Sequence, residues 1–261
     1  MSATRYRIGP MGRRQVLAGM AALPVVLTPP RLALAADPGR LSLTTGMREP
    51  WTKADKTGFT DLVVAELFRR LGLAAELSVN LAASRAIQLA EDGIDDGLAA
   101  RVKGLEAKYP NLVAVPEPIF ENDFVACSLG KRLEGTGWGA LAPHAVAYII
   151  GWQVFQNNLP DVRELTLAKD AAQLLSLLKA GRTDFILHER WQALRQAREA
   201  GAVLTVHEPP LARVPMFIYL HRRHADLVPR VAATLAEMKA DGTHDNIATR
   251  AFAGLVPKAP P

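Results

Sequence analysis

The sequence predicts an α/β protein built from two similar lobes. Strand-like and helix-like segments alternate along most of its 261 residues, the pattern of βαβ units on a largely parallel sheet. One unit occurs twice: a helix, a glycine, a nearby aspartate and a strand appear in "IQLAEDGIDDGLAA" (87–100) and again in "LSLLKAGRTDFIL" (175–187). Two such units far apart in the chain favour two similar α/β lobes over a single sheet.

The first lobe begins with alternating strands and helices. In the helix of "GFTDLVVAELFRRLGL" (58–73), apolar residues recur at helical spacing, Thr60 is the expected N-cap and Gly72 the stop. A shorter helix, 83–93, ends at Gly93. The strands expected around these helices are 40–46, 74–80 and 95–100.

The second half of the chain continues the alternation. Further strands are expected at 122–129, 144–150 and 213–222, with a last helix near 225–239. A chain that leaves one lobe by a strand and returns by another forms a two-strand hinge, with a ligand site at the carboxyl ends of strands. We assign 36–125 and 210–255 to lobe one, 126–209 to lobe two and 256–261 to a tail.

The first 35 residues are typical of an export signal. They hold five arginines and no acidic residue, then an apolar stretch and "ALA" at 33–35. Arg13-Arg14 resembles a twin-arginine signal, although Gly12 stands where Ser or Thr is usual. An uncleaved membrane anchor is the alternative, opposed by three prolines in the apolar stretch. We expect an exported periplasmic protein that is not embedded in the membrane.

The composition excludes several other classes of function. Removing the five signal arginines from the 31 basic residues leaves 26, which equals the 26 acidic residues, so no basic excess favours nucleic acid. The single cysteine, Cys127, forms no internal disulfide and is expected to be buried. His221 and His224 lack a third ligand nearby, so we expect no metal site, and no motif predicts a cofactor or catalytic residues.

Four segments resemble periplasmic solute-binding proteins of the polar amino-acid family (family 3). They are "GFTDLVVAELFRRLGL", "SRAIQLAEDGIDDGL", "LLSLLKAGRTDFILHE" and "MKADGTHDNIATRAF", in the family's order across the chain after the signal. The resemblance implies a two-lobed type II periplasmic binding fold that captures an amino acid or a similar small solute for an ABC-type importer. It also implies a monomer whose partners are a small solute and an inner-membrane permease.

The ligand clamp of lobe one departs from the family's pattern. The family's arginine position holds Lys108 and no Thr-x-x-Arg is present, while Arg101 directly follows the third strand. A guanidinium at a strand's carboxyl end would point into the cleft, so Arg101 is our candidate for a relocated anion clamp. The alternative is a solvated charge at a strand end.

The resemblance suggests six more ligand-binding residues. Three of them have a structural alternative: Glu189 is also typical of a helix's first turn, Trp152 of packing, and Arg85 of pairing within its lobe. Gly151 would let the backbone approach an anion, and Trp51 stands as a large aromatic in a polar loop. The full set of candidates is Arg101, Trp51, Gly151, Trp152, Glu189, Glu49 and Arg85.

Two rival functions remain beside solute delivery. One is an accessory or sensor protein with a degenerate cleft, favoured by the missing family arginine. The other is a dehydratase-like enzyme on the same scaffold, for which Glu189 and His188 are the only acid–base candidates. We expect binding without catalysis.

Overall fold

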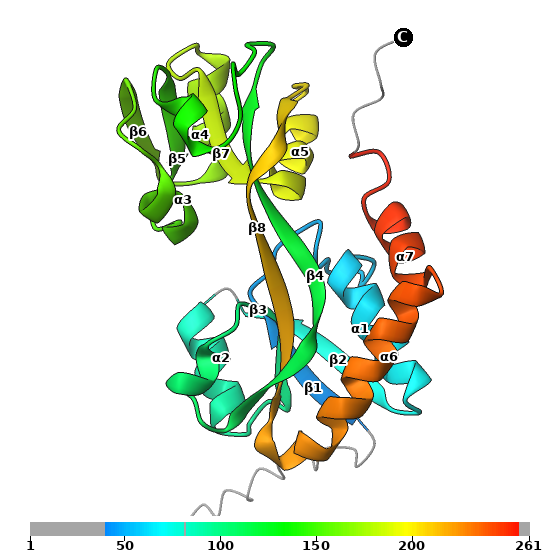
Figure 1. Ribbon diagram of the computed structural model, residues 1–261. Coiled ribbons are helices and arrows are strands. Elements are labelled where there is room, and N and C mark those ends of the chain that lie inside the picture. Colours follow the sequence, from blue (N-terminus) through cyan, green and yellow to red (C-terminus); the bar gives the residue numbers. More distant parts are fainter. Residues whose placement is uncertain (1–39, 81, 256–261) are drawn as a thin grey trace, which may run out of the picture. The chain divides into compact units, whose positions relative to one another are not determined.

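The computed structural model describes residues 40–80 and 82–255. In this part of the chain, eight strands form one sheet in the order β2-β1-β3-β8-β4-β7-β5-β6 (Figure 1). The expectation against a single sheet is wrong, because two long paired strands, β4 and β8, continue the hydrogen-bonded ladder from one lobe into the other. The predicted export segment 1–35 and the tail 256–261 lie outside the described residues.

Lobe one contains the first parallel unit. Strand β1 pairs in parallel with β2 and with β3, so the carboxyl ends of the three strands lie at one edge. The elements of this unit are β1 (Arg40–Thr45), α1 (Phe59–Arg70), β2 (Ala74–Val79), α2 (Ala83–Glu91) and β3 (Gly97–Arg101).

Lobe two repeats this arrangement. Strand β5 pairs in parallel with β6 and with β7, as β1 does with its two neighbours. The elements are β5 (Ala145–Ile149), α3 (Gln153–Asn158), β6 (Glu164–Ala168), α4 (Ala171–Lys179), β7 (Phe185–Glu189) and α5 (Arg190–Glu199).

Two long antiparallel strands run through both lobes. Strands β4 (Leu112–Ser128) and β8 (Thr205–His221) pair with each other along their lengths, β8 also pairs with β3, and β4 also pairs with β7. The expected lobe boundaries near 125 and 210 fall inside these strands (Figure 1). Helices α6 (Val228–Ala240) and α7 (Thr243–Ala251) follow; three 3₁₀ turns are η1 (Leu105–Ala107), η2 (Trp138–Leu141) and η3 (Arg222–Leu227).

An aspartate fixes the entry of the last parallel strand in each lobe. The Asp96 carboxylate accepts from the Ser42 amide at 2.7 Å, and the Asp184 carboxylate accepts from the Ala145 amide at 3.0 Å. The amides of the same aspartates donate back to the Ser42 and Ala145 carbonyls. Each aspartate thereby locks its strand against the first strand of its lobe, which explains why the sequence unit occurs twice.

The hydrophobic core is divided between the two lobes. The largest buried cluster takes residues from 41–120 and 216–252, and two further clusters take residues from 125–211. Cys127 is buried in lobe two, as expected.

The predicted N-cap of α1 is wrong. Gly58 is the N-cap, and Thr60 lies within the helix. Asp61 supplies the capping oxygen, accepting from the amides of Lys53 at 2.8 Å and Gly58 at 3.1 Å. A Cβ on Gly58 would lie 2.6 Å from the Trp51 carbonyl oxygen, so the close approach of this loop requires glycine.

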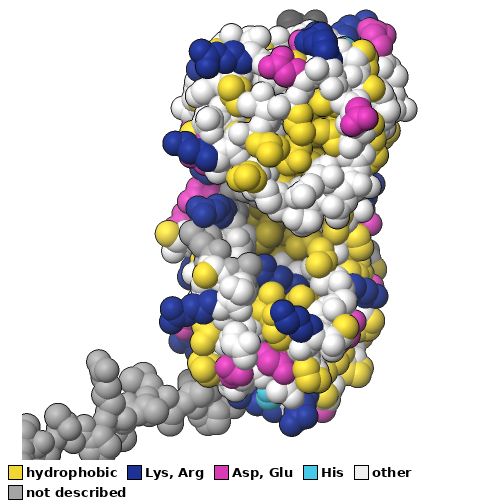
Figure 2. Space-filling view, turned by 90° about the vertical axis from the view of Figure 1, so that its left-hand side faces the viewer, with side chains coloured by type: hydrophobic (Ala, Val, Ile, Leu, Met, Phe, Trp, Pro, Cys, Tyr) yellow, Lys and Arg dark blue, Asp and Glu magenta, His cyan; other side chains and the backbone are white. Residues whose placement is uncertain are grey.

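Charges are mixed on the face that carries α2, α3 and β6. Figure 2 shows Lys and Arg side chains scattered among acidic ones on this face, with no single basic patch. Hydrophobic side chains gather on its upper part, and Leu165 and Leu167 of β6 are among the exposed ones. This mixture agrees with the balanced charge of the sequence after residue 35.

Candidate functional site

The carboxyl edge of lobe one holds Arg101. Gly46 follows β1, Asn80 follows β2, and Arg101 is the last residue of β3. A Cβ built on Gly46 would lie 3.2 Å from Arg101 Nη1 and 3.6 Å from the Asn80 carbonyl oxygen. The guanidinium therefore lies across the ends of the parallel strands, where α/β folds place their ligands.

The backbone directs Arg101 to this place. Ala100, just before it, has a φ of 63°, which is uncommon for a residue with a side chain. The pairing of β3 with β8 shifts register between Leu98 and Arg101. A local irregularity of this kind re-aims the side chain that follows.

Arg101 is half-buried, and two of the three nitrogens of its guanidinium are buried without a partner. Its Nε and Nη2 atoms are inaccessible to solvent and have no hydrogen-bond partner among the described residues. Burial lowers the pKa of Arg101, but an arginine remains charged in proteins. A buried charge that the protein does not compensate is costly, so the arrangement fits an anion that binds there.

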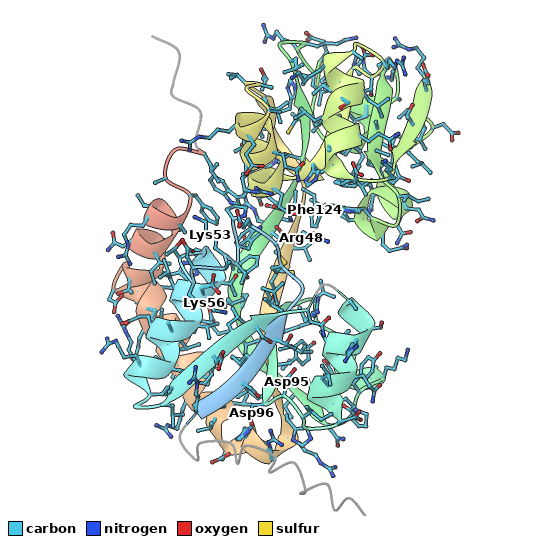
Figure 3. The ribbon with its side chains drawn as sticks, turned by 180° about the vertical axis from the view of Figure 1, so that it is seen from behind. Arg48, Lys53, Lys56, Asp95, Asp96 and Phe124 are labelled. Carbon is cyan, nitrogen blue, oxygen red and sulfur yellow. The ribbon has the colours of Figure 1, made fainter. Side chains whose placement is uncertain are left out.

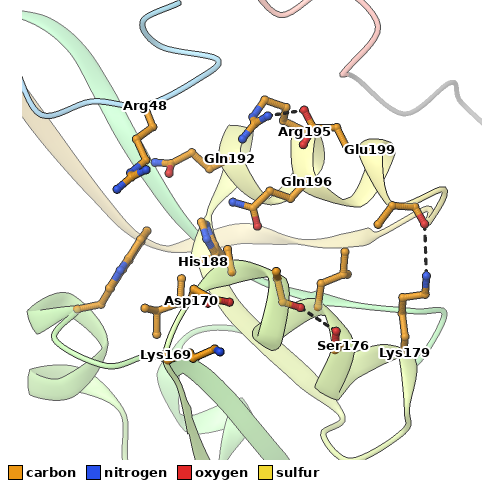
Figure 4. Close-up of a pocket in the computed structure, with 16 residues that line it drawn as sticks. Arg48, Lys169, Asp170, Ser176, Lys179, His188, Gln192, Arg195, Gln196 and Glu199 are labelled. Atoms are coloured by element: carbon orange, nitrogen blue, oxygen red, sulfur yellow. Dashed lines mark hydrogen bonds and ion pairs between the residues drawn. The ribbon is translucent and has the colours of Figure 1, made fainter. Parts of the chain in front are cut away.

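The carboxyl edge of lobe two borders a cavity of about 790 Å³. Figure 4 shows Arg48, from the loop after β1, reaching toward side chains of α4, α5 and β7. The lining residues are Arg48, Ile149, Trp152, Lys169, Asp170, Ala171, Ala172, Leu175, Ser176, Lys179, His188, Gln192, Arg195, Gln196, Glu199 and Ala200.

His188 lines this cavity, but its unused acceptor atom is hidden from solvent. It is only 2% exposed, and its Nδ1 lies 3.0 Å from the Glu189 carbonyl oxygen. A carbonyl only accepts, so Nδ1 carries the proton and Nε2 holds a lone pair. Nε2 is buried and has no partner among the described residues. Burial lowers the pKa of His188 to about 4, so the ring is neutral near pH 7.

Trp152 lies beside His188. The two rings are 4.8 Å apart, and Trp152 also stacks on Phe155 at 5.6 Å. The side chain is half-buried and lines the cavity, so it combines the packing role with a surface that a ligand can touch. Gly151 has a φ of 87° and is exposed, which explains the glycine in this turn. Its anion-binding role stays a prediction.

Trp51 and Glu189 occupy positions that do not fit ligand binding. Trp51 is 2% exposed and stacks on Phe120 at 4.0 Å. Its Nε1 donates to Glu189 at 3.1 Å, and Glu189 also accepts from the amides of Trp191 and Gln192, both at 2.9 Å. Glu189 is fully buried as the N-cap of α5. Both side chains are satisfied within the protein, so we correct their expected ligand role to a link between the lobes.

Glu49 and Arg85 are both exposed. Glu49 lies 3.7 Å from Arg195, across from lobe two, in an ion pair that solvent screens. Arg85 lies on α2 and makes no hydrogen bond or ion pair within 40–80 and 82–255. The structure brings neither residue to the cavity wall.

Of the residues that line this cavity, only Trp152 was in the predicted ligand set, and three of the others carry side chains suited to a polar ligand. Arg48 lies close to Trp51 in the sequence, Lys169 directly follows β6, and His188 is the penultimate residue of β7. The signal available for Lys169 and His188 was their place at the carboxyl ends of parallel strands. Arg48 sits in a loop, and its direction depends on the packing of Trp51.

Solved structures with a similar fold bind amino acids or sense signals. An ancestral cationic amino acid solute-binding protein aligns with a TM-score of 0.66 over 82% of this chain and 96% of its own, at 20% identity. The chain has the type II periplasmic-binding-protein fold. A GluR0 ligand-binding core in complex with L-glutamate has the same TM-score over 82% of this chain and 98% of its own, at 16% identity. A histidine kinase sensor domain with this fold aligns at 0.60 over 82% and 96%, at 16% identity.

Comparison with curated protein sequences finds a distant relative of this chain. An uncharacterised protein of Shewanella oneidensis is 24% identical over 189 residues, which cover 66% of this chain and 68% of the relative. No protein-family model matches the chain. Among the described residues, no helix is both long and apolar enough to span a bilayer, and no group of three potential ligands is placed to hold a metal ion.

Proposed function

We propose that this protein captures a small anionic solute between its lobes and delivers it to an ABC-type importer. The observation that supports the proposal is Arg101 at the carboxyl edge of lobe one: the side chain is half-buried, and two of its guanidinium nitrogens have no hydrogen-bond partner among the described residues. A bound carboxylate would supply the missing partner through charge-assisted hydrogen bonds.

The loop after β1 connects the two parts of the proposed site. Gly46 lies against Arg101, and Arg48, two positions later, lines the lobe-two cavity. Figure 3 shows Arg48 near the level of Phe124 on β4, whereas Asp95 and Asp96 lie at the opposite end of lobe one. The acidic turn before β3 is therefore remote from the anion site, and Asp96 is already paired with Arg223 at 2.5 Å.

The direct test is retention of ligand by the purified protein and by its Arg101→Ala variant. We expect native mass spectrometry to find a small anion bound to the wild type and lost from the variant. Hydrogen bonds to charged groups contribute about 1.5–3 kcal/mol each, so affinity should fall by about tenfold or more. Arg230→Ala, at an exposed arginine of α6, is the matched control and should retain the ligand. Equal affinity in the Arg101 variant and wild type would refute the proposal.

A second candidate function is solute sensing. A histidine kinase sensor domain shares this fold at a TM-score of 0.60. The same cleft would then report solute to a membrane partner instead of delivering it. Uptake of the retained anion by cells with and without this protein separates the two: loss of uptake supports delivery, and unchanged uptake supports sensing.

The proposal includes export and binding without turnover. The arginine-rich segment 1–35 supports export, and a mature chain that stays in the cytoplasm on cell fractionation would contradict it. Both carboxyl oxygens of Glu189 accept hydrogen bonds from the protein, which leaves no free carboxyl there for acid–base catalysis. Recovery of the retained anion chemically unchanged after prolonged incubation is the expected result.

A further inference from the structure

Three strand ends at the carboxyl edges of the lobes carry exposed apolar side chains. Val79 is the last residue of β2, Val102 directly follows β3, and Ile150 directly follows β5. Val79 and Val102 are each 47% exposed, and Ile150 is 63% exposed. A single exposed valine is ordinary, but these three side chains stand where α/β folds bind ligands, and ligand clefts are lined mainly by apolar groups. Figure 2 shows hydrophobic side chains, with Lys or Arg beside them, in the recess between the upper and lower parts of the molecule.

The two valines of lobe one lie on either side of the strand end that Arg101 crosses. In the sheet, β1 lies between β2 and β3. Val79 pairs with Thr45, the residue before Gly46, and Val102 follows Arg101 in the chain. Neighbouring strands are about 4.8 Å apart, so the ends of β2 and β3 flank the guanidinium that lies against Gly46. An apolar group bound next to this guanidinium therefore has valine side chains within reach.

Arg101 presents one nitrogen to a solute. Its Nε and Nη2 are hidden from solvent, whereas Nη1 is not, and none of the three has a hydrogen-bond partner among the described residues. A carboxylate that accepts from Nη1 would also offset the charge of the whole guanidinium. The accessible part of the group therefore suits a single carboxylate.

No carboxylate lies in the loops next to this guanidinium. The residues at the three strand ends are 46–48, 79–80 and 101–104, and none of them is acidic. In an α-amino acid the ammonium is one carbon away from the carboxylate, so it would lie beside Arg101 and be repelled. A carboxylate without an ammonium avoids this repulsion.

Of the carboxylates at Glu49, Asp170 and Glu189, only Asp170 keeps an unengaged oxygen. Glu49 lies 3.7 Å from Arg195, and both oxygens of Glu189 accept hydrogen bonds from the protein. Asp170 caps α4 through Oδ1, and its Oδ2 has no partner among the described residues. Asp170 is therefore the group through which an amino acid could still bind, and its substitution belongs in the test.

We infer that the solute is a carboxylic acid with an apolar body, one carboxylate and no ammonium group. The carboxylate accepts from Arg101 Nη1, and the body lies against Val79 and Val102. Ile150 offers an apolar surface at the edge of lobe two. The inference rests on the proposed anion capture and names its substrate class.

Three flexible six-carbon acids form the test. Hexanoate has an apolar chain, norleucine adds an ammonium at C2, and adipate replaces the terminal methyl group by a second carboxylate. In isothermal titration calorimetry at neutral pH, hexanoate should bind at least about tenfold more tightly than either of the others. The ammonium of norleucine is repelled by the guanidinium, and the second carboxylate of adipate would lose water against valine side chains.

A pair of matched variants then locates the apolar contact. Val79→Thr replaces one methyl group by a hydroxyl at an exposed strand end and should weaken hexanoate binding about threefold. Val203→Thr makes the same change at a valine that is 81% exposed in the loop before β8 and should leave hexanoate binding unchanged. Equal affinity in both variants would remove Val79 from the site. The preference of the wild type among the three acids needs no variant.

The outcomes separate this inference from the proposed function. Norleucine bound as tightly as hexanoate would overturn the exclusion of an ammonium, and Asp170→Asn then shows whether Asp170 receives it. Adipate bound as tightly as hexanoate would overturn the apolar body. If none of the three acids binds while another anion is retained on purification and lost in Arg101→Ala, the inference fails alone. If no anion is retained either, the proposed function fails with it.

Discussion

In each lobe, the last parallel strand ends on a charged residue. The two residues have opposite charges, and only one of them has its hydrogen-bond partners within the part of the chain that the structure describes. Strand β3 ends on Arg101 and β7 ends on Glu189, each at the same distance from an aspartate that locks its strand. Glu189 accepts from Trp51 and two helix amides. Two nitrogens of Arg101 are equally hidden from solvent but have no partner among the described residues.

This difference separates a charge that the fold uses from one that it leaves available. Glu189 is fully buried and its oxygens accept hydrogen bonds from the protein, so it serves the fold. Arg101 is half-buried and has two nitrogens without a partner among the described residues, which is the basis of its proposed ligand role.

The largest effect on stability is expected from substitution of Glu189. Glu189→Ala leaves Trp51 Nε1 and two helix amides without an acceptor, and each unsatisfied buried donor costs about 1–3 kcal/mol. We expect the free energy of unfolding to fall by about 3 kcal/mol or more in urea titrations. Glu199→Ala, which removes an exposed ion pair on the same helix, should change it by less than about 1 kcal/mol. A similar small change in both variants would mean that the link to Trp51 contributes little.

The second-largest effect is expected on the pH dependence of folding stability, and it comes from His188. Its pKa is about 4 in the folded protein and near 6.5 when unfolded, so the unfolded chain binds more protons between these values. Stability should therefore fall as pH drops from 6.5 toward 4, by about 1.4 kcal/mol per pH unit at most. Burial raises the pKa of Glu189, which acts in the opposite direction. The difference between wild type and His188→Phe isolates the histidine, and parallel stability curves for the two would contradict its neutral state.

Substitution of Arg101 should have the opposite effect on stability to substitution of Glu189. Arg101→Met replaces the arginine by a shorter, unbranched apolar side chain and removes a partly buried, uncompensated charge, so the ligand-free protein should gain about 1 kcal/mol of unfolding free energy. Anion binding should be lost in the same variant. A loss of stability of more than about 1 kcal/mol would show that the fold itself depends on the guanidinium.

The smallest effect is expected at Gly46. A methyl group there would lie 3.2–3.3 Å from the Arg101 guanidinium, close enough to shift it by a few tenths of an ångström. Gly46→Ala should weaken anion binding a few-fold and change unfolding free energy by less than about 1 kcal/mol. Gly139→Ala, which would meet no atom within 4 Å, is the control. Full wild-type affinity in Gly46→Ala would place the anion away from this side of Arg101.

Most of the fold could be predicted from the sequence because its signals are local. The glycine stops and the aspartates before β3 and β7 appear directly in the chain, and both aspartates have the same hydrogen-bonding role in the structure. Thr60 failed as a cap because Gly58 allows a closer approach and Asp61 supplies the capping oxygen from within the helix.

The candidate site could be predicted only in part. Arg101 is a candidate from its place at a strand end, and the structure adds that two of its guanidinium nitrogens are buried without a partner among the described residues; its ligand role stays a prediction. Trp51 and Glu189 were misassigned because their partner lies 138 residues away in the sequence, so no local pattern shows that each satisfies the other. The sequence also does not show which ring nitrogen of His188 carries the proton, because this depends on the hydrogen bond from Nδ1 to the Glu189 carbonyl oxygen.

The pairing of β4 with β8 has a mechanical consequence. The two strands form a continuous ladder from Leu112–His221 to Ser128–Thr205, but its register shifts between Ala114 and Pro118, again before Phe120, and once more between Phe124 and Ala126. Regular ladder sections resist bending, whereas an interrupted section has fewer bonds to strain. The first two shifts lie within the core of lobe one, which includes Val115, Ile119 and Phe120, and the third lies where β4 enters the core of lobe two. The regular section from Phe120 to Phe124 therefore joins the two cores as a stiff connector, and we expect any bending of the ribbon at the interruptions on either side of it.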